Sequence, residues 1–171
     1  PREDFTRGFM LENFGYYFGL SEYWDARVTG TVTTRGSYNA SLNAGYTKRY
    51  KFNGNFNFDY ASTRLGLEGT PEYEPRKDFS LIWSHSQNAS ARPGTTFSAS
   101  VNARTSSYNN NTAGGYGYNL NQIAENALSS SISYGKVFGN GLFNLSVAAR
   151  HSQLTTNNTV SLSLPEVSLN M

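Results

Sequence analysis

Hydrophobic and polar residues alternate strictly along most of the chain. In the stretch from Ser37 to Tyr50, the apolar positions are Tyr38, Ala40, Leu42, Ala44 and Tyr46. The positions between them are Asn39, Ser41, Asn43, Gly45 and Thr47. Because successive side chains of a β-strand point to opposite faces, this alternation predicts a strand with one apolar face and one polar face.

The same alternation predicts about nine antiparallel strands along the chain. Their predicted spans are Phe9–Phe18, Asp25–Arg35, Ser37–Tyr50, Gly54–Thr63, Asp78–Gln87, Thr96–Ser107, Ala127–Phe138, Leu142–Leu154 and Asn158–Asn170. Most of these spans have the roughly 9–11 residues with which a tilted strand crosses a bilayer.

Residues that favour tight turns separate the predicted strands. Asn53-Gly54 is a strong hairpin signal. The segments 35–37, 139–141 and 156–158 are rich in Gly and Asn, which tolerate positive φ. Two connections, 64–77 and 108–126, are long and are separated by one shorter turn, so we expect both on the same rim of an up-and-down barrel. Pro165 predicts a bulge or a strand end.

The polar face of the predicted strands is almost uncharged. Only 15% of the residues are charged, against roughly 25% in average proteins. Asn, Ser, Thr and Gly fill the polar positions, which suits the wet interior of a transmembrane barrel whose apolar side meets lipid. We therefore predict an all-β, antiparallel up-and-down transmembrane β-barrel segment in the outer membrane, with residues 1–171 as a single segment. A soluble secreted β-sandwich, such as an adhesin module, is the alternative.

Composition excludes several other classes of protein. The net charge of +2 is too small to indicate a nucleic-acid partner. No run approaches the roughly 20 apolar residues of a transmembrane helix, and the absence of cysteine excludes disulfides and cysteine-based metal sites. The chain opens with Pro1-Arg2-Glu3-Asp4 and not with a secretory signal, so we expect a mature chain or, preferably, an internal fragment. An odd number of strands also favours a fragment.

No catalytic constellation is visible in the sequence. His85 and His151 each neighbour a serine on the same predicted strand, and adjacent side chains of a strand point to opposite faces. This arrangement argues against a barrel-embedded esterase. Nucleotide-binding motifs and metal-ligand spacings are also missing. We therefore expect no enzyme activity, no metal and no cofactor.

Five arginines are the candidate ligand-binding residues. They share the polar, lumen-side register of the predicted strands and are Arg27, Arg35, Arg49, Arg104 and Arg150. Guanidinium groups in a confined lumen can hold phosphate or sugar-acid groups bidentately. The alternative is that they pair with Asp25, Asp59 and residues of a lumenal plug, or lie at the rims.

Aromatic residues gather near the ends of the predicted strands. They are Tyr16, Tyr17, Phe18, Tyr23, Trp24, Tyr50, Phe52 and Trp83. Such positions suit the aromatic girdles of membrane barrels, although the core of a β-sandwich would also use them. Lys48 shares the apolar register and is expected to extend its ammonium group to the membrane edge.

Four stretches of the chain together resemble a known family. They are Gly15–Asp25 with the alternation that follows to Ser37, Tyr46–Gly54, Lys77–Gln87 and Leu164–Leu169. In combination they are similar to the barrel region of LptD-like (OstA-type) lipopolysaccharide-assembly outer-membrane proteins, in the form found in Bacteroidota. None of the four is a catalytic motif.

The resemblance implies a large barrel of which this chain is an internal piece. Proteins of this family take lipopolysaccharide from a periplasmic bridge and release it into the outer leaflet through a lateral opening. A plug lipoprotein (LptE-like) fills the lumen, so the implied partners are lipopolysaccharide, outer-membrane lipid, this plug and the bridge proteins. No site residue carries over from the family. A porin or nutrient-transporter barrel fragment is the alternative within the same fold class.

Overall fold

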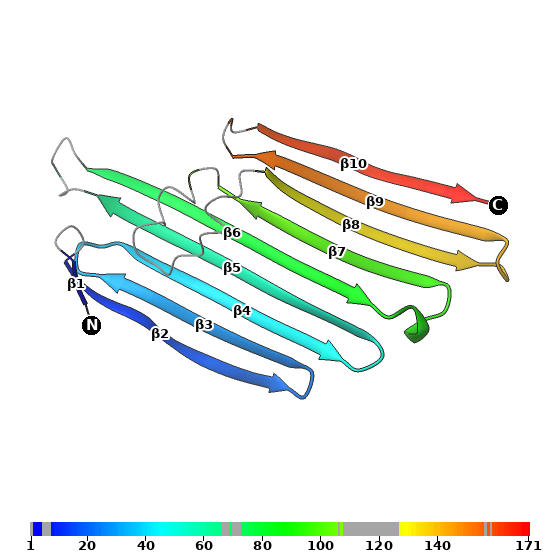
Figure 1. Cartoon of the computed structure of the whole chain (residues 1–171), viewed down its shortest axis with the longest axis horizontal. Coiled ribbons are helices and arrows are strands. Elements are labelled where there is room, and N and C mark those ends of the chain that lie inside the picture. The colour runs from blue at the N-terminus through cyan, green and yellow to red at the C-terminus, as the bar shows by residue number, and fades with distance from the viewer. Residues whose placement is uncertain are drawn as a thin grey trace.

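The described part of the chain forms one antiparallel sheet of ten strands (Figure 1). A computed structural model describes residues 2–4, 8–65, 69, 73–105, 107, 127–155, 157 and 159–171. The strands are β1 (Arg2–Asp4), β2 (Gly8–Ser21), β3 (Trp24–Thr33), β4 (Tyr38–Lys48), β5 (Phe52–Leu65), β6 (Glu74–Gln87), β7 (Thr95–Arg104), β8 (Ala127–Phe138), β9 (Phe143–Leu154) and β10 (Thr159–Asn170). The described residues add only a short 3-10 helix, η1 (Ala89–Ala91).

Each strand pairs with the next one in the sequence. This confirms the predicted all-β, antiparallel up-and-down topology. Among the described strands, β1 and β10 are the outermost strands of the sheet and do not pair with each other, so the sheet is open. In the described part of the chain, no helix is long and apolar enough to cross a membrane.

The nine predicted strands correspond to β2–β10. The prediction missed β1, which pairs with the start of β2 through only three residue pairs. The described strands therefore number ten, and their number does not favour a fragment as the predicted odd number did. It also placed the start of β5 at Gly54 and the start of β6 at Asp78, whereas these strands begin at Phe52 and Glu74. Long strands β5 and β6 pair along their whole length, from Phe52↔Gln87 to Leu65↔Glu74.

The predicted Asn53-Gly54 hairpin is wrong, because both residues lie inside β5. The chain reverses instead at 49–51, where Tyr50 has a φ of +61°. Gly54 serves packing: a β-carbon placed on it would lie 2.3 Å from the Tyr46 hydroxyl oxygen. The glycine therefore makes room for an aromatic ring on the neighbouring strand, a use of strand glycine that sequence alone does not separate from a turn.

The other predicted turns are confirmed. Gly36 has a φ of +83° between β3 and β4, and Gly139, Asn140 and Gly141 all have positive φ between β8 and β9. The chain reverses between Leu154 and Thr159, where the third turn was predicted. The register of β10 against β9 shifts between Ser163 and Glu166, as Pro165 predicted.

The two connections predicted to be long leave the sheet at the same edge, as predicted. The first is shorter than predicted, because β5 runs to Leu65 and β6 begins at Glu74, which leaves only 66–73 between them. β5 and β7 end at this edge and β6 and β8 begin there (Figure 1). We call it the long-loop edge and the opposite one the short-turn edge. Most residues of both connections lie outside the described residues. The shorter connection at 88–94 holds η1, where the Asn88 side chain accepts a hydrogen bond of 3.0 Å from the Ser90 N–H.

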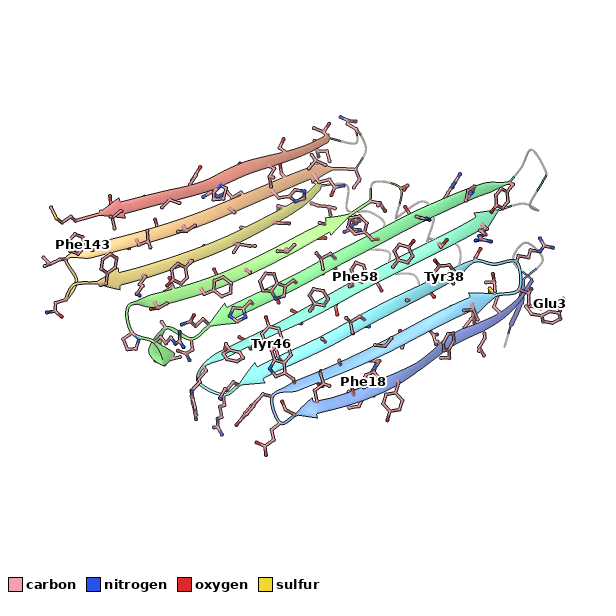
Figure 2. All side chains as sticks on the ribbon, turned by 180° about the vertical axis from the view of Figure 1, so that it is seen from behind. Glu3, Phe18, Tyr38, Tyr46, Phe58 and Phe143 are labelled. Atoms are coloured by element: carbon pink, nitrogen blue, oxygen red, sulfur yellow. The ribbon has the colours of Figure 1, made fainter. Side chains whose placement is uncertain are left out.

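The register gives the sheet two different faces. One face carries the row Val28, Leu42, Phe58, Leu81 and Ala103, which are neighbours across β3 to β7. The other carries the row Thr29, Ser41, Asp59, Ser80 and Arg104. We call them the apolar face and the polar face. Figure 2 shows the side chains standing off both sides of this single layer.

The apolar face is largely exposed. Leu162 is 73% exposed and Val28 is 41% exposed. Only a few apolar side chains are buried among the described residues: Met10, Ala26, Tyr46, Ala61, Ala99 and Leu128. The described residues contain no second sheet, so they do not form the closed, dry core that the sandwich alternative requires.

Candidate functional site

Three of the five candidate arginines lie on the polar face. Arg27 is on β3, Arg104 on β7 and Arg150 on β9, each on the register predicted from the sequence. Arg35 and Arg49 were also predicted on strand registers, and this is wrong, because both lie in turns.

The two errors have a local cause. β3 ends at Thr33, whose N–H bonds the Ser37 carbonyl at 2.9 Å and closes the turn that holds Arg35. β4 ends at Lys48, whose carbonyl accepts from the Lys51 N–H at 2.9 Å. The alternation continues through both turns in the sequence, so the pattern alone overruns the ends of the strands.

The structure does not gather the arginines into one pocket. Arg27 and Arg104 are separated by four strand intervals, or ~19 Å at the usual spacing between strands. At the short-turn edge, the Arg49 guanidinium lies 4.8 Å from the centre of the Tyr50 ring. The polar face therefore offers separate basic positions and not a single anion cage.

Arg104 belongs to a buried polar patch near the long-loop edge. The patch consists of polar-face residues with at most 2% of their surface exposed: Thr31, Thr63, Asp78, Ser80 and Arg104. Asp78 accepts hydrogen bonds from the hydroxyls of Thr105 and Ser107. The Arg104 carbonyl accepts a bond of 2.7 Å from Gln153 Nε2. Since these side chains are almost fully buried, this end of the polar face is closed to a large ligand.

Arg150 has different surroundings, because it is exposed and stands among serines. The serine strip covers the polar face of β7 to β10 and consists of Ser98, Ser100, Ser129, Ser131, Ser133, Ser146, Ser152, Ser161, Ser163 and Ser168. Hydroxyl pairs bond across the strands, Ser98 to Ser133 at 2.7 Å and Ser146 to Ser168 at 2.6 Å. A hollow of about 360 Å³ lies beside Arg150 in this strip.

The serine strip can accept hydrogen bonds, donate them and offer one positive charge. Sugar hydroxyls bind through such hydrogen-bond donors and acceptors, and phosphates bind through donors and positive charge. Sequence reasoning assigned these serines to the polar register but did not identify them as a site. The alternate serines Ser129, Ser131 and Ser133 on β8 and Ser161 and Ser163 on β10 were the available signal.

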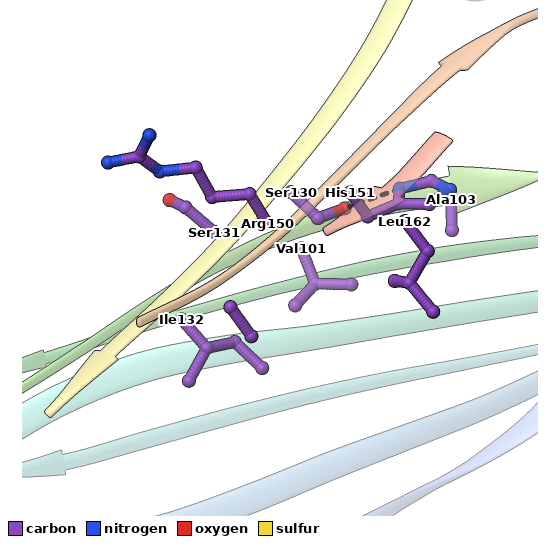
Figure 3. Close-up of a pocket in the computed structure, with 9 residues that line it drawn as sticks. Val101, Ala103, Ser130, Ser131, Ile132, Arg150, His151 and Leu162 are labelled. Carbon is purple, nitrogen blue, oxygen red and sulfur yellow. Dashed lines mark hydrogen bonds between the residues drawn. The ribbon is translucent and has the colours of Figure 1, made fainter. Parts of the chain in front are cut away.

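The same strands carry an apolar groove on their other side. In Figure 3, Arg150 and Ser131 point to one side of the strands, and Val101, Ile132 and Leu162 point to the other. This groove encloses about 220 Å³. Polar and apolar side chains are thus separated by the thickness of one strand layer.

A side chain replaces backbone pairing where β7 meets β8. The ladder of backbone partners ends at Ser100↔Ser131. Beyond it, the Ser130 hydroxyl accepts from the Asn102 N–H at 3.0 Å and donates to the Asn102 carbonyl at 3.1 Å. His151 Nδ1 lies 3.3 Å from the same hydroxyl. This cross-strand serine–histidine pair was missed in the sequence, and the hydroxyl serves the pairing of the sheet.

Aromatic side chains gather on the apolar face close to the short-turn edge. We define the aromatic cluster as Trp24, Tyr46, Phe52, Trp83, His85 and Phe97. The Tyr46 hydroxyl accepts from Trp83 Nε1 at 2.9 Å and bonds His85 Nδ1 at 2.9 Å. The aromatic rings of Trp24 and Tyr46 stack at 4.5 Å. Three predicted girdle residues are members, whereas Tyr46, His85 and Phe97 were not predicted.

The described residues contain no group of three or more His, Cys, Asp or Glu residues placed to hold a metal ion. The geometry instead provides a two-sided surface, with hydroxyls, amides and separate guanidinium groups on one side and exposed hydrocarbon on the other.

Comparison with known proteins identifies the family. The model of the family described as LptD protein matches residues 1–171, which is the whole chain. No curated protein matches the chain. The LptD family consists of outer-membrane proteins that transport lipopolysaccharide, and it is not an enzyme family. Since the match covers every residue, the chain belongs to the LptD protein family.

Proposed function

We propose that this chain is part of an outer-membrane barrel that inserts lipopolysaccharide into the outer leaflet. The observation that carries the proposal is the two-faced single sheet of an LptD-family chain. Its polar face is covered by hydroxyls and amides with exposed Arg27 and Arg150, and its apolar face is exposed hydrocarbon. Barrels of the outer membrane meet lipid with such an apolar face and enclose water with a polar one.

The long-loop edge and the short-turn edge suggest how the sheet is oriented in the outer membrane. Outer-membrane barrels have short periplasmic turns and longer extracellular loops. On this basis the short-turn edge lies in the periplasm and the long-loop edge lies outside the cell. The apolar face would then contact outer-membrane lipid, and the polar face would line the path of lipopolysaccharide.

The open sheet favours a larger barrel in which residues 1–171 form one segment. The backbone groups along the free sides of β1 and β10 need partners in a membrane, because hydrocarbon cannot satisfy them. Additional strands would supply those partners. The resemblance to the Bacteroidota form of the family adds an LptE-like plug lipoprotein and the proteins of a periplasmic bridge as proposed partners.

Transport of this kind needs weak, repeated contacts and no covalent chemistry. Hydroxyls of the serine strip would exchange hydrogen bonds with sugar groups. Arg27 and Arg150 would contact phosphates in succession. The buried position of Arg104 and the turn positions of Arg35 and Arg49 give these three a smaller part in the path.

Photo-crosslinking in cells tests the proposed path. A photoreactive residue at Ser100 on the polar face should form adducts with lipopolysaccharide in transit. The adjacent position Val101, on the apolar face, is the matched control and should label phospholipid instead. Lipopolysaccharide adducts at Val101 but not at Ser100 would contradict the assignment of the faces.

Depletion of the full protein separates transport of lipopolysaccharide from a porin-like role. We expect loss of newly made lipopolysaccharide at the cell surface while uptake of small solutes continues. Loss of solute uptake with normal surface lipopolysaccharide would instead support a diffusion channel.

A further inference from the structure

A basic pocket lies at the short-turn edge of the apolar face. Three cations line it: Lys48 at the end of β4, Lys51 in the following turn, and Arg92 after η1. Its remaining walls are Phe52, His85, Gln87 and Ala91. The pocket encloses about 420 Å³, and no acidic side chain lines it. We call it the basic rim pocket.

Two connections of the chain are tied together to form this pocket. The Asn88 N–H bonds the Lys51 carbonyl at 2.8 Å, which joins the 88–94 connection to the 49–51 turn. Within the 88–94 connection, the Arg92 carbonyl accepts from the Thr95 N–H at 2.9 Å. The two connections that carry the cations are therefore joined by a backbone hydrogen bond.

None of the three cations has a carboxylate partner within the described part of the chain. Lys48 Nζ lies 4.7 Å from the centre of the Tyr23 ring, which is a cation–π contact. Lys51 and Arg92 are exposed. The pocket thus concentrates three positive charges without internal compensation, and this arrangement favours an anionic ligand.

The position of the pocket relative to the aromatic cluster defines its depth in a membrane. Trp and Tyr side chains concentrate where hydrocarbon meets the headgroups. Lys48 follows Tyr46 by two residues on the same face, which places it ~7 Å closer to the edge of the sheet. At that level a lysine reaches the layer of lipid phosphates.

We propose that the basic rim pocket binds the phosphate of an anionic phospholipid in the periplasmic leaflet. Lys48, Lys51 and Arg92 hold the phosphate, and an acyl chain runs along Phe52 and His85 onto the apolar face. A lipid fits better than free phosphate, because the pocket opens onto exposed hydrocarbon. It also fits better than an acidic protein segment. The aromatic walls Phe52 and His85 would then contact only polar groups, whereas an acyl chain gives them an apolar partner.

The inference rests on the apolar face meeting lipid and on the short-turn edge lying in the periplasm, which are both part of the proposed function. It does not depend on lipopolysaccharide passing along the polar face. Direct measurement of phospholipid binding therefore fails or succeeds independently of the transport assays.

The experiment uses full-length protein in detergent and native mass spectrometry. The probes are short-chain phosphatidylglycerol, short-chain phosphatidylcholine and inorganic phosphate. A cation close to an anionic lipid surface contributes about fivefold in affinity. We expect the Lys48→Gln, Lys51→Gln, Arg92→Gln triple variant to bind phosphatidylglycerol at least tenfold more weakly than the unmodified protein, with binding of phosphatidylcholine unchanged.

Two further variants serve as controls. Lys77→Gln removes a cation of the same apolar register at the long-loop edge and should leave binding unchanged. Lys48→Arg keeps the charge and should retain binding, and migration on unheated gels reports folding of each variant.

Four results would overturn the proposal. The first is that the folded triple variant binds phosphatidylglycerol as tightly as the unmodified protein, and the second is that Lys77→Gln loses as much affinity as the triple variant. The third is that inorganic phosphate fully displaces phosphatidylglycerol. The fourth is that the triple variant releases a bound protein while its affinity for lipid stays unchanged.

Discussion

At the scale of single residues, the contact between Gly54 and Tyr46 fixes how β4 and β5 pack on the apolar face. The two residues are direct partners in the register. The glycine has no side chain, so the Tyr46 ring lies over its backbone and reaches Trp83 and His85. One missing side chain on β5 thus positions a polar group within an otherwise apolar cluster.

We predict that Gly54→Ala destabilises the folded protein by about 1–3 kcal/mol, the usual cost of overpacking. The new β-carbon would lie 2.3 Å from ring atoms of Tyr46, which are held by hydrogen bonds. Urea unfolding in lipid vesicles measures the change. Gly19→Ala is the control, because a β-carbon there meets no atom closer than 4.0 Å, and its unfolding midpoint should stay within error.

The Tyr46 hydroxyl has a separate, measurable role. We predict that Tyr46→Phe costs about 1–3 kcal/mol, because Trp83 Nε1 loses its acceptor within the aromatic cluster. Thermal unfolding followed by near-ultraviolet circular dichroism reports both stability and the environment of the tryptophan. Tyr16→Phe on exposed β2 removes a hydroxyl for which the described residues give no partner and should have no effect. Equal effects of both variants would contradict this role.

At the scale of elements, the backbone ladder between β7 and β8 is the shortest among β2 to β10. It has six backbone pairs, from Thr95↔Lys136 to Ser100↔Ser131. β5 and β6, by contrast, pair from end to end. The Ser130 hydroxyl holds the rest of the junction through the backbone of Asn102. Beyond the last backbone pair, one side chain therefore takes over the bonding between the two strands.

We predict that Ser130→Ala lowers the free energy of local opening at this junction by about 1–3 kcal/mol, since the Asn102 N–H loses its acceptor. Hydrogen exchange of the backbone amides near Asn102 should accelerate, while exchange in β5 and β6 stays unchanged. Ser129→Ala, which alters an exposed neighbour on the polar face, is the control. Uniform acceleration across the sheet would indicate global destabilisation and contradict a local role.

At the scale of the whole molecule, the described strands form one layer, and the proposed function places lipid on one side of it and water on the other. In a soluble protein, an exposed apolar surface of this extent would promote association. In a membrane, hydrocarbon covers this surface and no second layer is needed. The family assignment and the architecture agree on this point.

A pair of neighbouring substitutions tests this separation. Leu42 and Asn43 lie near the middle of β4 on opposite faces. We predict that Leu42→Arg destabilises the folded protein in vesicles by about 2–4 kcal/mol, the cost of an arginine at the midplane of a bilayer. Asn43→Arg should change stability much less, because water solvates its charge. Equal costs, measured by urea titration, would show that both faces meet the same solvent.

Sequence reasoning was most reliable where a local rule acts. The alternation predicted nine strands, their order and their faces, because side-chain direction in a strand depends only on position along the chain. Turn glycines such as Gly36 and Gly139 were identified because their backbone requires positive φ. Pro165 was identified because it cannot donate to a ladder.

Sequence reasoning was least informative where the surroundings of a residue depend on contacts with residues far away in the chain. Gly54 has the sequence context of a turn residue, and only the structure shows that it makes room for the Tyr46 ring on β4. The burial of Arg104 near the long-loop edge was not visible in the sequence either. The basic rim pocket is built from the end of β4, the next turn and the segment after η1, and no spacing in the sequence relates Lys48 to Arg92.

The sequence by itself determined that this protein is an antiparallel sheet with one apolar face and one almost uncharged polar face. Alternation, turn residues and composition are local properties, and they are sufficient for that conclusion. Tertiary structure alone decided which polar side chains are buried, which arginines stay apart and where cations from separate hairpins meet. These properties depend on the register between strands, and hydrogen bonds and packing between residues far apart in the chain set that register.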